Sequence, residues 1–411
     1  MDLREEFVLR AKAPGACIAA LCREYAVSRK TGYKWLARFD AEGVEALADM
    51  SRRPRRVVET SGEVVLQIQE LRAAHPRWGP KKLRVLLARR LPNEEVPSVK
   101  TIARILDRLG AARIRRPRVR LVTVDRNAPR HDVRGPNDVW TVDFKGWWRT
   151  RDGERCDPLT VRDAFSRLVL CLRVMTSTAG DPVRAVFVEL FTGYGLPKVI
   201  HVDNGSPFGS TRARAGLSRL SAWWVALGIT ASFGRPAHPQ DNGGHERMHA
   251  DVAGELEGSA AETLKSQQVA CDAWVEEFNE VRPHEAIAMK TPASLYKRSS
   301  RTYRGVRPAR YPAGFRMRSV SPNGTIKFGR KAPFIGTAFA GYQVGVLEVD
   351  ATTIRVHFYE VDLGCFDLVV AADKGVSAPR RGGLEQNTTT STARSSAPSA
   401  GGTRPRRPRS R

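Results

Sequence analysis

The sequence predicts a multidomain protein with two all-α units first, a mixed α/β domain next and a small β domain last. Three observations support this fold class. Apolar residues near the N-terminus recur with helical spacing, the middle of the chain mixes strand-like and helical runs, and the region beyond Tyr296 contains short β-rich runs separated by turns. At 411 residues with 41% hydrophobic composition, the chain can build several cores.

The chain is strongly basic, and its positive charge is unevenly placed. The 68 Lys and Arg residues against 43 Asp and Glu give a formal net charge of +25. Segments 52–56, 111–134 and 376–411 carry +4, +6 and +7 of it. Such segments suit a chain that lies along a phosphate backbone, because each neutralised phosphate releases a counterion. Arg outnumbers Lys 54 to 14, which a GC-rich genome also explains, so arginine content alone does not establish nucleic-acid binding.

Membrane and disulfide-rich classes are not expected. No apolar run approaches the roughly 18 residues that a membrane span needs, and the start, MDLREEFVLRAK, alternates charge too closely for a signal peptide. The six cysteines include no CxxC pair, so neither a disulfide framework nor a cysteine zinc site is supported. We therefore expect a cytoplasmic protein with no membrane partner.

The first segment, residues 3–50, has the pattern of a helix, a tight turn and a second helix. Ser28 is a candidate N-cap for the second helix, predicted over 29–39. The candidates for its buried face are Tyr33, Leu36 and Trp35. The basic residues that it would present to a major groove are Arg29, Lys30, Lys34 and Arg38. A three-helix bundle with a solvated basic face explains the same residues equally well.

A second helical unit follows the basic segment. Helices are predicted over 63–74, 80–90 and 99–109. Ser98 is a candidate N-cap and Gly110 a C-terminal stop for the last of them. Its core face is Ile102, Ile105 and Leu106, and its exposed basic residues are Lys100, Arg104 and Arg108. Two DNA-binding units in one chain suit a long DNA site, because once the first unit has bound, binding of the second becomes intramolecular.

The middle of the chain predicts a mixed α/β domain. Three β-rich runs at 138–148, 159–163 and 168–175 indicate an antiparallel meander. Helices are expected at 182–191, 217–227, 240–257 and 261–281, and strands at 199–202 and 229–233. Antiparallel strands followed by alternating helices and strands are typical of such a domain.

The last folded region is predicted to be a small β-barrel. Short strands are expected at 315–320, 326–328, 343–349, 353–359 and 365–370, with a hairpin turn at Asn323-Gly324. The expected domains are a helix-turn-helix unit (1–56), a second helical DNA-binding unit (57–112), a basic linker (113–134), the α/β core (135–300), the barrel (310–372) and a disordered basic tail (373–411).

Three carboxylates stand in unusual contexts. Asp143 lies within an apolar and aromatic run, Asp203 follows the apolar run VIHV at a strand end, and Glu246 opens a predicted helix in HPQDNGGHERMH. Each alone has a structural explanation, since a strand-end Asp is often a turn former and a first-turn Glu often complements the helix dipole. Together they suggest a metal site, because Mg²⁺ prefers carboxylate oxygens and two such ions can promote in-line displacement at a phosphodiester.

Other polar residues near this set carry weaker hypotheses. Asp163 could lie near the metals, although a structural pairing with an arginine is the more favoured reading. A zinc site of His238, His245, His249 and His284 fits no common spacing. Candidate contacts to DNA are Lys145, Asn204, Asn242 and Arg247, and a solvated surface position would also explain each of them.

The motifs resemble those of integrase-core DDE transposases of bacterial insertion sequences, relatives of retroviral integrases with a ribonuclease H-like fold. The runs WTVDFKG, HVDNGSPF and RPAHPQDNGGHERMH are similar to the family's three motifs, and FNEVRPHEAIAMKTPASLY to the stretch that closes the core. The resemblance implies that Asp143, Asp203 and Glu246 are the catalytic, metal-binding triad. The 42 residues between Asp203 and Glu246 exceed the family's usual spacing, and an insertion within 209–224 would explain the excess.

The resemblance implies a polynucleotidyl transferase that uses Mg²⁺ or Mn²⁺, as two ions. It would bind the terminal inverted repeats of a mobile element, cleave the element end to leave a 3′ hydroxyl, and join that hydroxyl to target DNA. Expected partners are double-stranded DNA and further copies of the chain, in the bacterial nucleoid. The alternatives are a catalytically inactive DNA-binding regulator derived from a transposase, and a ribonuclease acting on RNA–DNA hybrids.

Overall fold

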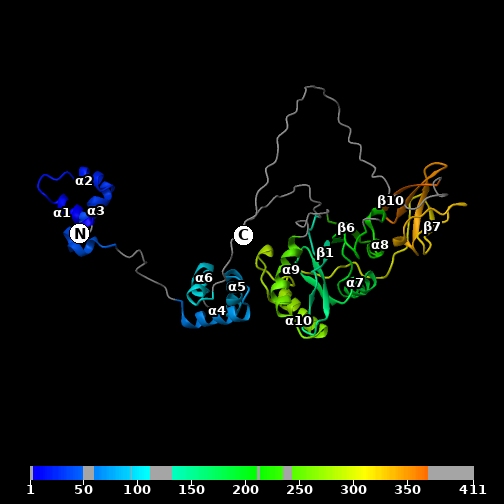
Figure 1. Cartoon of the computed structure of the whole chain (residues 1–411), viewed down its shortest axis with the longest axis horizontal. Helices are drawn as coiled ribbons and strands as arrows, with labels where there is room; N and C mark the ends of the chain where they lie inside the picture. Colours follow the sequence, from blue (N-terminus) through cyan, green and yellow to red (C-terminus); the bar gives the residue numbers. More distant parts are fainter. Residues whose placement is uncertain are drawn as a thin grey trace, which may run out of the picture. The chain divides into compact units, whose positions relative to one another are not determined.

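A computed structural model describes residues 3–49, 60–93, 95–111, 132–210, 213–234 and 243–368 (Figure 1). The chain divides into two compact units, Met1–Arg113 and Ile114–Arg411. Within the described ranges, no helix combines the length and apolarity needed to cross a membrane. The six cysteines all lie in the described ranges and are free thiols.

The first helical group has the predicted helix-turn-helix pattern. It comprises α1 (Leu3–Ala11), α2 (Ile18–Glu24), α3 (Arg29–Glu42) and a 3₁₀ turn, η1 (Val44–Leu47). The Ser28 hydroxyl accepts a hydrogen bond from the Thr31 N–H at 3.1 Å, which confirms the predicted N-cap. Gly32 allows α3 to approach α2 closely, because a Cβ there would lie 2.6 Å from Cys22 Sγ.

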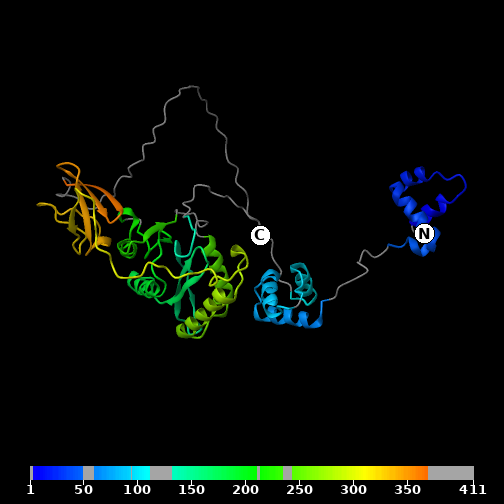
Figure 2. The ribbon, with the colours of Figure 1, turned by 180° about the vertical axis from the view of Figure 1, so that it is seen from behind.

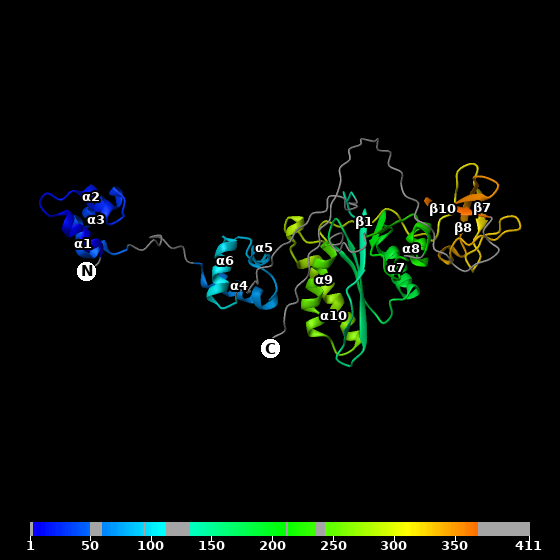
Figure 3. The same cartoon turned by 45° about the horizontal axis from the view of Figure 1, so that its top comes forward.

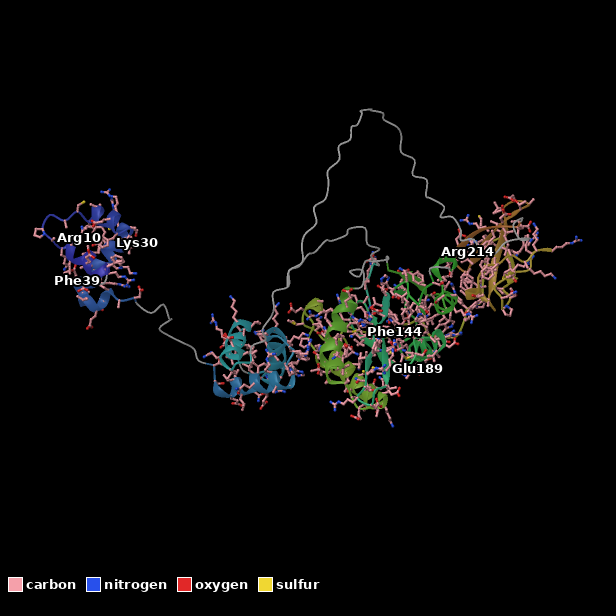
Figure 4. All side chains as sticks on the ribbon, viewed as in Figure 1. Arg10, Lys30, Phe39, Phe144, Glu189 and Arg214 are labelled. Atoms are coloured by element: carbon pink, nitrogen blue, oxygen red, sulfur yellow. The ribbon has the colours of Figure 1, made fainter. Side chains whose placement is uncertain are left out.

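The buried face of α3 differs from the prediction at one residue. Tyr33 is 56% exposed, so its expected burial is wrong. Trp35 and Leu36 instead pack against the core of Phe7, Val8, Leu21, Cys22 and Leu47. The error arose because three neighbouring residues cannot all face inward on a helix that turns about 100° per residue. Arg29, Lys30 and Lys34 are exposed and Arg38 is half-buried; Lys30 is labelled in Figure 4.

The second helical group follows the prediction closely. Its helices are α4 (Gly62–Ala74), α5 (Pro80–Arg90) and α6 (Val99–Arg108). The Ser98 hydroxyl accepts from the Thr101 N–H at 3.1 Å, and Gly110 takes a positive φ of 66° after the helix. The predicted core residues Ile102, Ile105 and Leu106 are all buried, whereas Lys100 and Arg104 are exposed.

A mixed sheet forms the centre of the second compact unit. Its strands are β1 (Val139–Phe144), β2 (Trp148–Arg149), β3 (Arg155–Asp163), β4 (Val169–Met175), β5 (Val199–Val202) and β6 (Thr230–Phe233). The order is β2-β3-β1-β5-β6, with β4 paired to the other edge of β3. β1, β3 and β4 are antiparallel neighbours, whereas β1, β5 and β6 run parallel.

Helices cover both faces of this sheet (Figure 3). On one face α7 (Gly180–Tyr194) and α8 (Arg219–Ala226) pack on Trp140, Val142 and other sheet residues. On the other face α9 (Gly243–Glu255) and α10 (Leu264–Glu276) enclose a separate cluster with β2, β3 and β4. The sheet is therefore buried on both sides, which explains why β3 lacks the alternation of a half-exposed strand.

Several element boundaries depart from the predicted ones. The run 138–148 forms two strands rather than one, because Gly146 takes a φ of 92° between them. β3 begins four residues earlier than expected, and the helix predicted over 261–281 ends in a π turn at Glu277–Val281. The expected helix start at 240 lies outside the described residues.

The C-terminal strands form an antiparallel sheet of order β10-β9-β8-β7. They are β7 (Arg316–Ser319), β8 (Gln343–Glu348), β9 (Thr353–Phe358) and β10 (Val361–Asp367). The expected strand at 326–328 appears only as isolated bridges. Closure into a barrel is not confirmed in the described part of the chain.

This small sheet packs on the α/β core through α8 (Figure 2). Ala222, Val225 and Ala226 share a buried cluster with Ile354, Phe358 and neighbouring sheet residues. Arg214, labelled in Figure 4, also stacks over the ring of Phe366 at 4.2 Å.

Candidate functional site

Asp143 lies on β1 beside Thr160 of β3 and His249 of α9. In the antiparallel register it stands opposite Thr160, and its side chain is 33% exposed. The pKa of its carboxyl is raised to about 7, first by burial and then by the negative charges of Asp203 and Glu246. Because the charges of Asp203 and Glu246 act on Asp143, the three predicted carboxylates lie near one another.

Strand register explains why Asp203 approaches Asp143. β1 and β5 are parallel, and Thr141 pairs with His201. Each Asp lies two residues beyond its member of this pair, so both stand at the carboxyl end of adjacent strands. Asp203 is exposed, and its Oδ1 accepts from the Gly205 N–H at 3.2 Å.

Glu246 occupies the first turn of α9 and is exposed. Within the described residues, no three His, Cys, Asp or Glu side chains are grouped closely enough to hold a metal ion. The three carboxylates are thus close enough to affect one another's charge, but they do not form a preassembled set of metal ligands. The catalytic triad stays a prediction.

Two histidines of α9 lie behind Asp143. His245 is 1% exposed; its Nδ1 contacts Thr141 Oγ1 at 2.9 Å and its Nε2 contacts Thr160 Oγ1 at 2.5 Å. His249 Nε2 contacts the same Thr160 oxygen at 2.8 Å, and its Nδ1 lies 3.8 Å from Asp143 Oδ2. Burial, with Lys145 and Arg162 nearby, lowers the pKa of His249 to about 4, and burial lowers that of His245 well below its usual value.

Arg162 fastens the start of α9 to the sheet. It is 4% exposed and donates from Nη1 to the Gly244 carbonyl. Burial, then the neighbouring Arg167, lowers its pKa to about 9. A Cβ at Gly244 would lie 2.8 Å from Arg167 Nη1 and 3.2 Å from Arg162 Nη1, so the absence of a side chain lets both guanidinium groups reach the helix start.

The weaker candidates mostly have structural partners. Lys145 Nζ donates to Glu257 at 2.7 Å, and Asn204 Nδ2 donates to the Gly234 carbonyl at 2.6 Å. Arg247 is exposed, and Asn242 lies outside the described residues. Asp163 accepts from the Asn137 N–H and from Ser166, so its role is structural, although its hydrogen-bond partners are not the expected arginine.

The zinc hypothesis for the histidines gains no support from the structure. His284 contacts the Phe278 carbonyl and ring, whereas His245 and His249 contact the threonines of β1 and β3. His238 lies outside the described residues.

Thr160 and Arg162 are the residues that sequence reasoning missed. Their relation to Asp143 and Gly244 depends on the pairing of β1 with β3, and no local motif specifies that pairing. The available signal was His245 and His249 at i, i+4 on one helix face, next to a carboxylate.

Comparison with known families agrees with the described domains. Residues 3–55 match a helix-turn-helix domain and residues 31–106 a homeodomain-like domain. Residues 133–239 and 227–292 match integrase core domains. The chain therefore contains N-terminal DNA-binding domains of the helix-turn-helix type and an integrase core, which is the domain composition of a transposase or integrase.

Among the proteins to which this chain is similar are proteins of bacterial insertion elements. The chain is 27% identical over 230 residues to the uncharacterized 31.7 kDa protein of insertion element IS407 of Burkholderia multivorans, covering 56% of this chain and 79% of that one. It is 28% identical over 168 residues to an uncharacterized protein of insertion element IS136 of Agrobacterium tumefaciens, covering 39% and 80%. The chain is accordingly similar to integrase-core transposases of insertion sequences, and an inactive regulator is not favoured.

One solved structure aligns with part of the chain. The HTLV-2 integrase catalytic core domain in complex with magnesium aligns at a TM-score of 0.31 and 18% identity. The alignment covers 40% of this chain and 100% of that one.

Proposed function

We propose that the chain binds the terminal inverted repeats of a mobile element and catalyses metal-dependent DNA cleavage and strand transfer with Asp143, Asp203 and Glu246. The domain composition and the insertion-element relatives support the DNA-processing class. The observation that carries the catalytic part is the pKa of Asp143, which Asp203 and Glu246 raise together with burial. Three acids that repel one another without a cation are typical of a functional site.

The donors fit a hard divalent cation. All three are carboxylates, and the crowding that raises the pKa of Asp143 is relieved when a cation neutralises them. Mg²⁺ or Mn²⁺, as a pair of ions, supplies activation of the attacking oxygen and stabilisation of the leaving oxygen at a phosphodiester.

Different elements of the chain supply the metal ligands and the contacts to DNA. Asp143 is fixed on a central strand, whereas Asp203 follows β5 and Glu246 opens α9, so ligands come from three separate elements. Lys145 is paired with Glu257, and it stays a candidate contact to DNA. The exposed basic residues of α3 and α6 would contact the element ends. Because strand transfer joins two ends, we expect a homo-oligomer on DNA.

The test uses the purified full chain, Mg²⁺ and a duplex that carries the inverted repeat flanking the reading frame. Wild-type protein should nick the end and join it to target DNA. Asp203→Asn should abolish both steps and leave end binding unchanged. The matched control is Asp181→Asn, an exposed acid on the first turn of α7, which should retain full activity.

Each contrary result has a defined meaning. Wild-type protein that binds the ends but neither cleaves nor joins them would refute the enzymatic proposal. Normal transfer by Asp203→Asn would refute the metal assignment. Preferential cleavage of an RNA–DNA hybrid would favour a ribonuclease instead.

A further inference from the structure

The Thr160 hydroxyl determines which nitrogens of the two histidines carry hydrogen. It makes three contacts: with the Asp143 carbonyl at 2.8 Å, His245 Nε2 at 2.5 Å and His249 Nε2 at 2.8 Å. A hydroxyl has one hydrogen to donate and two lone pairs to accept with, and a carbonyl oxygen only accepts. All three contacts are satisfied only when Thr160 donates to Asp143 and both histidines donate from Nε2.

This assignment leaves the two Nδ1 atoms as acceptors in different surroundings. The single hydrogen of the Thr141 hydroxyl can be donated to the Arg162 carbonyl at 3.4 Å or to His245 Nδ1 at 2.9 Å. The shorter contact to His245 Nδ1 satisfies both nitrogens of that ring. His249 Nδ1 faces Asp143 Oδ2 at 3.8 Å, and no hydrogen-bond donor to it is found in the described part of the chain. A nitrogen lone pair and a carboxylate oxygen repel each other unless a positive species lies between them.

The separation of these two atoms suits ligands that share one cation. With metal–ligand distances of about 2.0 to 2.2 Å, two ligands of one ion lie about 3 Å apart when they meet at a right angle and at most about 4.4 Å apart when they are opposite. The 3.8 Å between His249 Nδ1 and Asp143 Oδ2 is within this limit. It is also too long for a direct hydrogen bond.

We propose that His249 Nδ1 is a ligand, with Asp143, of the divalent cation at the active site. The inference rests on the proposed function and adds a nitrogen donor to its three carboxylates. Thr160 then has the role usual for an outer partner, because accepting from the opposite ring nitrogen fixes the tautomer and ring orientation of a metal-binding histidine. An imidazole ligand favours Mn²⁺ relative to Mg²⁺, which prefers oxygen.

His245 provides an internal comparison for this assignment. The two rings are perpendicular at 4.7 Å and share Thr160. His245 has hydrogen-bond partners at both nitrogens and is almost wholly buried. His249 has its second nitrogen turned toward the partly exposed carboxylate, so packing alone does not explain its orientation.

The decisive experiment measures Mn²⁺ bound to the full chain by pulsed electron paramagnetic resonance, with histidine labelled with ¹⁵N. The wild-type spectrum should contain a coupling to a histidine nitrogen. His249→Ala should lose this coupling and bind Mn²⁺ at least roughly 10 times more weakly, since removing even an outer partner of a ligand costs about 10- to 100-fold. The matched control is His357→Ala in the C-terminal sheet, which should keep both properties.

Two more variants separate ligation from folding. Thr160→Val keeps the His249 ring but removes its acceptor, so the nitrogen coupling should weaken. His249→Asn places an oxygen near the former Nδ1, so it should recover Mg²⁺ binding without any nitrogen coupling. Circular dichroism and thermal unfolding identify any variant that fails to fold, and Thr160→Val then replaces it as the test.

The outcomes distinguish this inference from the proposed function. Bound Mn²⁺ without a histidine coupling in wild-type protein would overturn the role of His249 and leave the carboxylate site intact. A coupling that persists in His249→Ala would assign the nitrogen to another histidine and also overturn it. Failure of wild-type protein to bind any divalent cation, with or without end DNA, would refute the proposed function itself.

Discussion

The raised pKa of Asp143 predicts that the metal-free chain loses stability as the pH rises from about 4 to about 7. The folded-state pKa is about 7, against 3.8 as the ordinary value. A carboxyl that binds its proton more tightly when folded stabilises the folded state below its ordinary pKa, and this contribution disappears as the pH rises through the folded-state pKa. Stability therefore decreases across this window.

The size of the effect follows from the shift and the exposure. A shift of about 3 pKa units corresponds to about 4 kcal/mol. Because 33% of the side chain is exposed, solvent screening reduces the expected contribution to about 2 kcal/mol. Asp143→Asn cannot ionise, so it should be more stable than wild type by about 2 kcal/mol at pH 7.5 and by little at pH 4.5.

Urea unfolding followed by tryptophan fluorescence provides the assay, since Trp140, Trp223 and Trp224 lie in the hydrophobic core of the α/β domain. The quantity of interest is the difference in unfolding free energy between wild type and Asp143→Asn at each pH. Asp181→Asn should show the wild-type pH dependence. Saturating Mn²⁺ should restore about 2.7 kcal/mol to wild type at 100 times its dissociation constant. A difference that stays constant from pH 4.5 to 7.5 would refute this electrostatic reasoning.

Three further predictions test the supporting structure and the DNA contacts. Gly244→Ala places a Cβ 2.8 Å from Arg167 Nη1 and 3.2 Å from Arg162 Nη1; the end of the Arg167 side chain can move, whereas Arg162 is buried, so we expect a loss of about 1 kcal/mol in chemical denaturation and weaker strand transfer, and unchanged stability and transfer would contradict the close approach. Asn279→Ala leaves the Val169 backbone N–H and carbonyl, each 2.9 Å from its side chain, without their partner, so we expect a loss of about 3 kcal/mol, with Asn279→Asp intermediate. Lys30→Ala should lower the slope of log affinity against log salt by about 0.9, measured by fluorescence anisotropy, and a change in end preference instead would indicate base reading.

Local signals predicted the helical groups and the short parallel strands well. Ser28 and Ser98 cap their helices as expected, because N-capping depends on residues within one turn. β5 spans Val199–Val202 as predicted, since a buried parallel strand is a short continuous apolar run. The break in the run 138–148 was missed because Gly146 within an apolar stretch does not reveal its positive φ.

The sequence identifies the three carboxylates of the candidate site, and their role stays a prediction; the sequence does not give their arrangement. Motifs identified Asp143, Asp203 and Glu246 without knowledge of their distances. The partners of Asp143 depend on register, because Thr160 comes opposite it only through the pairing of β1 with β3. The hydrogen bonds of His249 depend on the relative positions of β1, β3 and α9, and no sequence pattern predicts those positions.

The contacts in the structure give part of the positive charge a structural role. Residues 286–347 contain twelve Lys and Arg and no Asp or Glu, a concentration that counts of the linkers and the tail overlook. Several of these cations have structural partners: Arg298 donates to the Thr192 carbonyl in the last turn of α7, and Arg307 donates to the Val225 carbonyl in the last turn of α8. Cations at helix C-termini complement the helix dipole and attach this segment to the core.

The exposed residues of the segment include Arg304, Arg310, Lys327, Arg330 and Lys331. Net charge therefore overstates the capacity of the chain to bind phosphate, since part of its positive charge holds the core and the C-terminal sheet together.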